Sequence, residues 1–110
     1  MNYVDFCVGG KEYKLVLTTR NIVTLESKLG CNVGAIFGLD EKNPRIPTVT
    51  DMVNILHAAL QKYQHNITIS DTYDIFDDYI AEGNEPNSFL ETVIKIYQVS
   101  GILKGETEKN

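Results

Sequence analysis

The histidines and cysteines are the residues whose types could support metal binding or nucleophilic catalysis. A zinc site on a helix needs a second ligand one turn away, but the residue four positions after His57 is Gln61, and His65 does not complete an H-E-x-x-H motif. Cys7 and Cys31 could meet a histidine only through the fold, and the local sequence favours two small buried apolar side chains instead. We therefore expect no metal, no cofactor and no catalytic residue, with a Cys/His enzyme as the disfavoured alternative.

Four carboxylates recur at i, i+3, i+4 and i+8 near the end of the chain, a spacing that places them on one face of a helix. They are Asp74, Asp77, Asp78 and Glu82. The stripe lacks the central glycine of a calcium loop and the enclosed cleft that glycoside hydrolysis requires. Two interpretations remain, a hydrated surface and a docking face for a basic partner. No Lys or Arg lies between Gln64 and Ile94, and like charges at i and i+4 cost a few tenths of a kcal/mol, which gives the docking face some weight.

The composition excludes several classes of protein. A length of 110 residues suits one domain, and 43% hydrophobic with 23% charged residues is typical of a folded chain. A net charge of −5 repels phosphate backbones, so we expect no nucleic-acid partner. Two cysteines make no disulfide framework, the first residues do not resemble a signal peptide, and no run approaches about 18 apolar residues. We expect a cytoplasmic protein without membrane contact.

The elements that must position these residues begin with a β-hairpin over residues 3–17. Apolar residues alternate on both arms around Gly9-Gly10, a two-residue turn. With these glycines at the tip, Phe6 faces Tyr13 and Val4 faces Leu15, so the apolar residues of both arms lie on one side. A lone hairpin is marginally stable, so this side must pack on helices or on another subunit.

Capping signals predict the helical part. Thr18 or Thr19 begins a helix that ends at Gly30, and Asn32 begins a short turn that ends at Gly38. Residues 40–47 form a loop. Thr48, with Asp51 in a capping box, begins a helix that runs to about Gln64, and Leu56 and Leu60 lie on its buried face.

Capping residues and apolar spacing also predict the last two helices. Thr68 or Ser70 begins a helix over about residues 71–82, with Tyr73, Ile75, Phe76, Tyr79 and Ile80 as its apolar face. Ser88 and Glu91 form an S-x-x-E box for the last helix, whose buried side includes Ile94 and Tyr97. The fold class is thus mainly α, an N-terminal β-hairpin followed by about four helices, one of them short. We expect a single small domain over residues 1–104 (hairpin 3–17, helical part 18–104) and a flexible tail over 105–110.

Three segments resemble the tail assembly chaperones encoded by long-tailed bacteriophages and prophages of Gram-positive bacteria. The first runs from Tyr13–Leu17 to Leu25–Gly30, ending in LESKLG. The second is Thr50–Tyr63, containing ILHAALQ. The third combines Asn66–Asp71, Phe76–Tyr79 and Val99–Ile102. These are packing and capping residues rather than a chemical signature.

The resemblance implies a non-enzymatic protein of the bacterial host cytoplasm. Such chaperones bind the tape measure protein, keep it soluble and help tail tube proteins polymerise around it, so the implied partners are these two proteins. We also expect a homo-oligomer, because the hairpin and the helices carry more apolar surface than one small core needs. The alternative is a small bacterial helical adaptor or regulatory protein unrelated to phage.

Overall fold

The computed structural model describes residues 2–38 and 45–103, and its element order confirms the predicted fold class. Two antiparallel strands, β1 (Val4–Val8) and β2 (Lys11–Leu15), are followed by the helices α1 (Thr19–Leu29), α2 (Val49–Leu60), α3 (Ile69–Ala81) and α4 (Phe89–Val99). Two short 3₁₀ helices, η1 (Val33–Phe37) and η2 (Pro86–Ser88), precede α2 and α4. The predicted tail over 105–110, and residues 40–44 of the predicted loop, lie outside the described residues.

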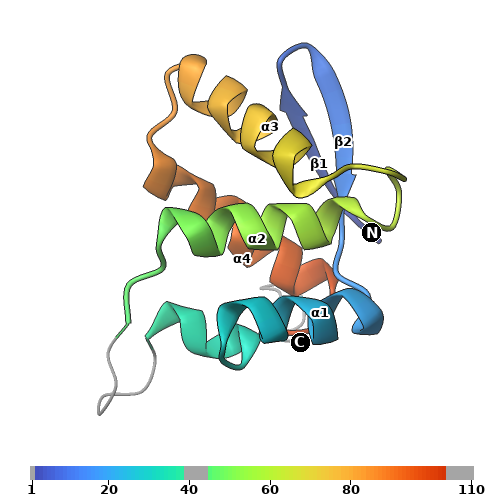
Figure 1. Cartoon of the computed structure of the whole chain (residues 1–110), viewed down its shortest axis with the longest axis vertical. Helices are drawn as coiled ribbons and strands as arrows, with labels where there is room; N and C mark the ends of the chain where they lie inside the picture. The colour runs from blue at the N-terminus through green and yellow to red at the C-terminus, as the bar shows by residue number, and fades with distance from the viewer. Residues whose placement is uncertain (1, 39–44, 104–110) are drawn as a thin grey trace, which may run out of the picture.

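The hairpin has the predicted register. Phe6 pairs with Tyr13 and Val8 with Lys11, and both turn glycines have positive φ. Phe6, Val8 and Leu15 are buried. Their side of the ribbon packs against α3 and α4, as Figure 1 shows, so helices of the same chain cover the hairpin face.

The outer edge of β2 is covered at its C-terminal end by the last turn of α2 and by Gln64, which follows that helix. The backbone N–H of Lys14 donates to Oε1 of Gln64 (2.7 Å), and Nε2 of Gln64 donates to the Lys14 carbonyl (2.9 Å). The Val16 N–H donates to the Ala59 carbonyl (3.1 Å). One side-chain amide and one helix carbonyl thereby pair backbone groups that an edge strand otherwise leaves to water or to another strand.

Threonine caps begin three of the helices as their sequences predict. Thr18 accepts from the Asn21 N–H, and Thr48 forms the predicted capping box with Asp51. Thr68, one of the two predicted caps of α3, forms a second box with Asp71. The Thr68 hydrogen bonds lower the pKa of the Asp71 carboxyl, because they stabilise its charged form.

Two helix ends differ from the prediction. The helix α2 ends at Leu60 rather than near Gln64, where the Gln61 backbone N–H donates to the Ala58 carbonyl (3.4 Å) and the Gln61 side chain donates to the His57 carbonyl in its place (2.9 Å). The S-x-x-E box predicted at Ser88 and Glu91 is wrong. Pro86 begins a 3₁₀ turn that puts Ser88 in a helical conformation, and its hydroxyl donates to the Glu85 carbonyl instead (2.6 Å).

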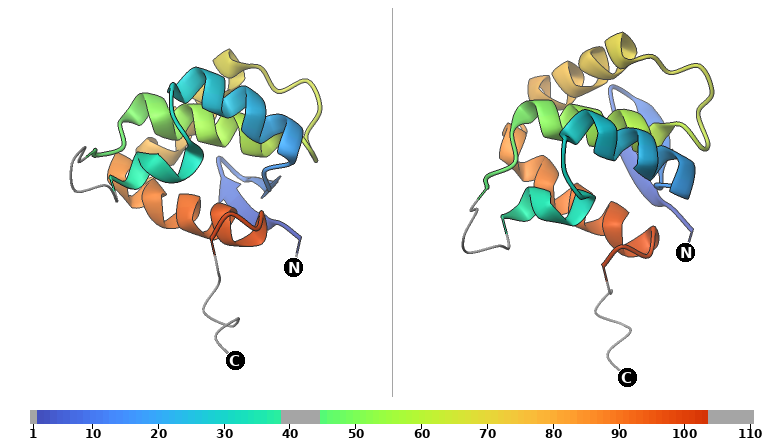
Figure 2. Two further views of the ribbon diagram at one scale, coloured as in Figure 1. Left: turned by 90° about the horizontal axis from the view of Figure 1, so that it is seen from below. Right: turned by 60° about the horizontal axis from the view of Figure 1, so that its bottom comes forward.

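The core is centred on α2, which packs against α1, α3, α4 and β2 (Figure 1). Leu56 and Leu60 are fully buried, as predicted. The 3₁₀ helix η1 lies between α1 and α4 (Figure 2), where the Tyr97 hydroxyl donates to the Val33 carbonyl (2.8 Å). Burial raises the pKa of Tyr97 well above its ordinary value.

Part of the predicted apolar faces is exposed. Tyr73 is 55% exposed, Ile94 41% and Ile80 36%. The reason is geometric, because each helix contacts its neighbours over a strip narrower than the full set of its apolar positions. Within residues 2–38 and 45–103, none of the helices combines the length and apolarity needed to cross a membrane.

Candidate partner-binding site

The acidic stripe lies on the outer side of α3, and all four of its carboxylates are exposed. Its members are Asp74, Asp77, Asp78 and Glu82. They do not form one uniform surface, because α3 has the hairpin turn on one side and α2 on the other (Figure 1). The stripe therefore divides into residues that face the hairpin and residues that face α2 or solvent.

Glu82 and Asp78 face the hairpin turn. Oε2 of Glu82 accepts a hydrogen bond from the Gly9 N–H (2.6 Å). A Cβ atom added at Gly9 would lie 3.0 Å from Oδ2 of Asp78, so this carboxylate is in contact with the turn. Burial and the charge of Asp78 raise the pKa of Tyr13. These two carboxylates therefore have a structural partner within the chain.

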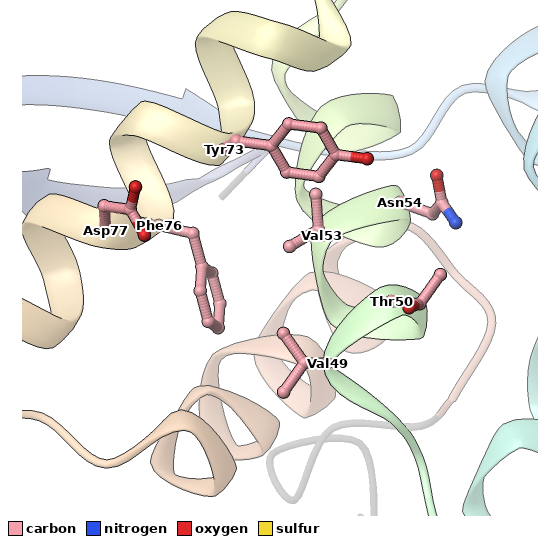
Figure 3. A pocket seen from close by; sticks show the side chains of 7 residues that line it. All are labelled: Val49, Thr50, Val53, Asn54, Tyr73, Phe76 and Asp77. Atoms are coloured by element: carbon pink, nitrogen blue, oxygen red, sulfur yellow. The ribbon is translucent and has the colours of Figure 1, made fainter.

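Asp77 faces the other way, toward an open apolar hollow between α2 and α3. Its apolar lining comes from Val49 and Val53 of α2 and from Tyr73 and Phe76 of α3. Figure 3 shows Val49, Val53 and Phe76 pointing toward one another, with the ring of Tyr73 along one side. Val53 and Phe76 are only 5% exposed and form the floor, whereas Val49 (47%) and Tyr73 (55%) form the open walls.

The rim of the hollow is polar. Thr50 and Asn54 of α2 lie on one side, and Asp77 lies on the other. The rim on α2 is thus uncharged, whereas the rim on α3 is negative. The hollow has a volume of about 150 Å³. A cavity of this size lined by apolar groups can hold one benzene-sized group.

The surroundings of His57, Cys7 and Cys31 differ from one another. Burial, followed by the charge of Lys28, lowers the pKa of His57. Partial desolvation and the Glu12 carboxylate raise the pKa of the Cys7 thiol, which is the opposite of what a nucleophilic cysteine needs. Cys7 is exposed, so its prediction as a buried apolar residue is wrong, and half-buried Cys31 accepts a hydrogen bond from Arg45 (2.7 Å).

In the part of the chain that the structure describes, no three His, Cys, Asp or Glu side chains lie close enough together to hold a metal ion.

Val49 was not predicted as a site residue, and Tyr73 was predicted to lie on the buried face of its helix. A signal for both was present in the spacing. Val49 and Val53 lie one turn apart at the start of α2, and Tyr73, Phe76 and Ile80 recur at i, i+3 and i+7 on α3. The sequence did not show that α2 and α3 diverge enough to leave these residues uncovered.

Comparison of the chain with protein-family models, with curated proteins and with solved structures finds no match.

Proposed function

We propose that this protein is a tail assembly chaperone of a long-tailed bacteriophage or prophage, and that it binds the tape measure protein without catalysing a reaction. The observation that supports the proposal is the open apolar hollow between α2 and α3. It occurs in a chain that contains the three segments that resemble such chaperones, and these segments lie within the hairpin, the helices and their connections.

An assembly chaperone must expose apolar surface to hold its client and must itself stay in solution. The walls of the hollow provide the first property, because Val49 and Tyr73 are about half exposed. The net charge of −5 provides the second. The exposed Asp77 lies at the rim of the hollow, so apolar surface and negative charge occur together there.

The proposed site of action is the cytoplasm of the bacterial host. There the chaperone keeps the tape measure protein soluble until tail tube proteins assemble around it. In this role the protein contributes binding energy only, and the chaperone itself must leave its client before the virion is finished. A shallow hollow suits such transient binding, since small interfaces are typical of weak complexes.

Co-expression tests the proposal. The tape measure protein encoded beside this gene is expressed alone and together with the tagged chain, and the soluble fraction and the co-purified material are measured. The proposal expects the tape measure protein to become more soluble and to co-purify. If it does neither, the proposal is wrong. A neighbourhood of metabolic or regulatory genes without tail tube or tape measure genes would favour the alternative, a small bacterial helical adaptor.

A further inference from the structure

We infer that the hollow between α2 and α3 binds an amphipathic helix, which inserts one large apolar side chain and carries Lys or Arg on the flank that faces α3. The inference rests on the proposed function, because it names the chemical class of the client segment. Three properties favour this partner: the volume of the hollow, the hydrogen bonding of its two helical walls, and the negative charge at its rim.

The size of the hollow fits one anchoring side chain. A volume of about 150 Å³ can accommodate the side chain of one leucine or phenylalanine. The nearly buried floor of Val53 and Phe76 would contact the tip of that side chain, and the exposed walls of Val49 and Tyr73 would contact its sides. Ile80 lies two turns after Tyr73 on the same side of α3, about 10 Å further along the helix. A second apolar residue of the partner can pack there.

The backbone chemistry of the walls favours a helix over an extended strand. Both walls are α-helices, whose interior backbone groups are already hydrogen-bonded within each helix. An extended segment would find no edge to pair with and would leave its own N–H and C=O groups without protein partners. In a helical partner the backbone N–H and C=O groups are already hydrogen-bonded to one another. Helix-in-groove recognition depends on this property.

The charge favours a basic partner and disfavours a second copy of this chain. No Lys or Arg lies between Gln64 and Ile94, a range that contains all of α3. Asp77 lines the hollow, whereas Asp74 lies with Asp78 and Lys11 on the hairpin side of α3. A second copy would bring its own net charge of −5 against this surface. The opposite rim, Thr50 and Asn54, is uncharged, so the cations of the partner belong on the side of α3.

The probes for this inference are two synthetic helical peptides of about 20 residues, a length at which an alanine-based helix forms in water. Both carry leucine at every third or fourth position on one face. One peptide has lysine on the neighbouring flank, and the other has glutamate at the same positions. Binding to the full chain is measured by fluorescence polarisation at low ionic strength. We expect the lysine peptide to bind at least ~10-fold more tightly than the glutamate peptide.

Two variants separate the apolar and the electrostatic contributions. Tyr73→Ala removes an exposed wall and should weaken binding of the lysine peptide at least ~5-fold, as for an aromatic anchor contact. Its matched control is Val23→Ala on α1, which is also exposed but distant from the hollow. Asp77→Asn should weaken binding about 2- to 5-fold, the range of an exposed ion pair. Asp5→Asn on β1 is the matched control. Neither control should change the affinity.

Equal affinity for the two peptides would overturn the charge assignment, and an unchanged affinity of Tyr73→Ala would overturn the hollow as the site. Co-purification distinguishes this failure from failure of the proposed function. If the tape measure protein co-purifies equally with wild type and Tyr73→Ala, the chaperone function stands and the assigned site is wrong. If it does not co-purify but the lysine peptide binds in a Tyr73-dependent manner, the helix-binding site stands and the phage function is wrong.

Discussion

Removal of the Asp77 carboxylate within α3 and of the Glu82 carboxylate just after it should change the free energy of unfolding in opposite directions. Asp77 is exposed, faces the hollow and lies three residues after Asp74. Asp77→Ala removes a like-charge repulsion of a few tenths of a kcal/mol and introduces a stronger helix former. We expect this variant to be about 0.5 kcal/mol more stable than wild type.

Glu82→Ala should be destabilising, although the electrostatics of α3 alone predict the reverse. Glu82 follows the last residue of α3, where a negative charge opposes the helix dipole, and it lies four residues after Asp78. The helix dipole and the repulsion from Asp78 would together make removal of the Glu82 carboxylate stabilising by about 0.5–1 kcal/mol. Its hydrogen bond from the Gly9 N–H (2.6 Å) opposes them. For an exposed carboxylate this bond contributes about 1.5 kcal/mol, the low end for a charged acceptor. The net effect is a destabilisation of about 0.5–1 kcal/mol.

Urea unfolding followed by circular dichroism measures both variants against wild type, with an unchanged m-value as the control for two-state behaviour. At about 1 M salt the gain from Asp77→Ala should shrink, because charges at the surface are screened within about 3 Å. If Glu82→Ala is stabilised as much as Asp77→Ala, the hairpin turn is not held by the Glu82 carboxylate in solution, and Glu82 belongs to the free part of the acidic stripe.

Four further predictions concern the core, the titrating groups and the assembly state. Leu56→Ala should cost about 2–5 kcal/mol, because its side chain is fully buried, and a melting temperature lowered by less than about one degree would contradict this. Burial and Lys28 lower the pKa of His57 below 6.5, so the unfolded chain binds its proton more readily. Stability should therefore fall between about pH 7.5 and 5.5 more steeply in wild type than in His57→Gln, and parallel pH curves would exclude this role. Because its pKa is raised, Cys7 should react with iodoacetamide at about pH 8 more slowly than free cysteine, and a faster reaction would revive the Cys/His enzyme. We also expect self-association, and sedimentation as a monomer at every concentration would argue against it.

Local signals predicted most of the fold. The hairpin register follows from two alternating arms around Gly9-Gly10, and the start of α2 follows from Thr48 and Asp51. In both cases the residues that determine the structure lie within a few positions of one another in the sequence, so the local sequence is enough to predict it. The exception is Ser88, where a strong local motif was overridden by Pro86, which had already begun a 3₁₀ turn.

The candidate site was less predictable because it depends on contacts distant in sequence. The spacing of the acidic stripe gave its helix face correctly, but only the hydrogen bond between Glu82 and Gly9, 73 positions apart, shows that part of the stripe is already occupied. Likewise, periodicity marks Val49 and Tyr73 as apolar positions without showing whether a neighbour covers them. That depends on how α2 and α3 pack, which their individual sequences do not encode.

The pairing of Lys14 with the Gln64 amide makes the two edges of the hairpin unequal. The β2 edge offers no free backbone groups at Lys14, so an incoming strand cannot extend the sheet there without displacing Gln64. On β1 the groups of Asp5 and Cys7 point away from β2, and they have no backbone partner within residues 2–38 and 45–103. An incoming strand is thereby excluded at Lys14, whereas the outward backbone groups of Asp5 and Cys7 stay open on β1. There the exposed charge of Asp5 opposes the indiscriminate strand pairing that leads to aggregation, so a glutamine protects part of one edge of the hairpin and an aspartate protects part of the other.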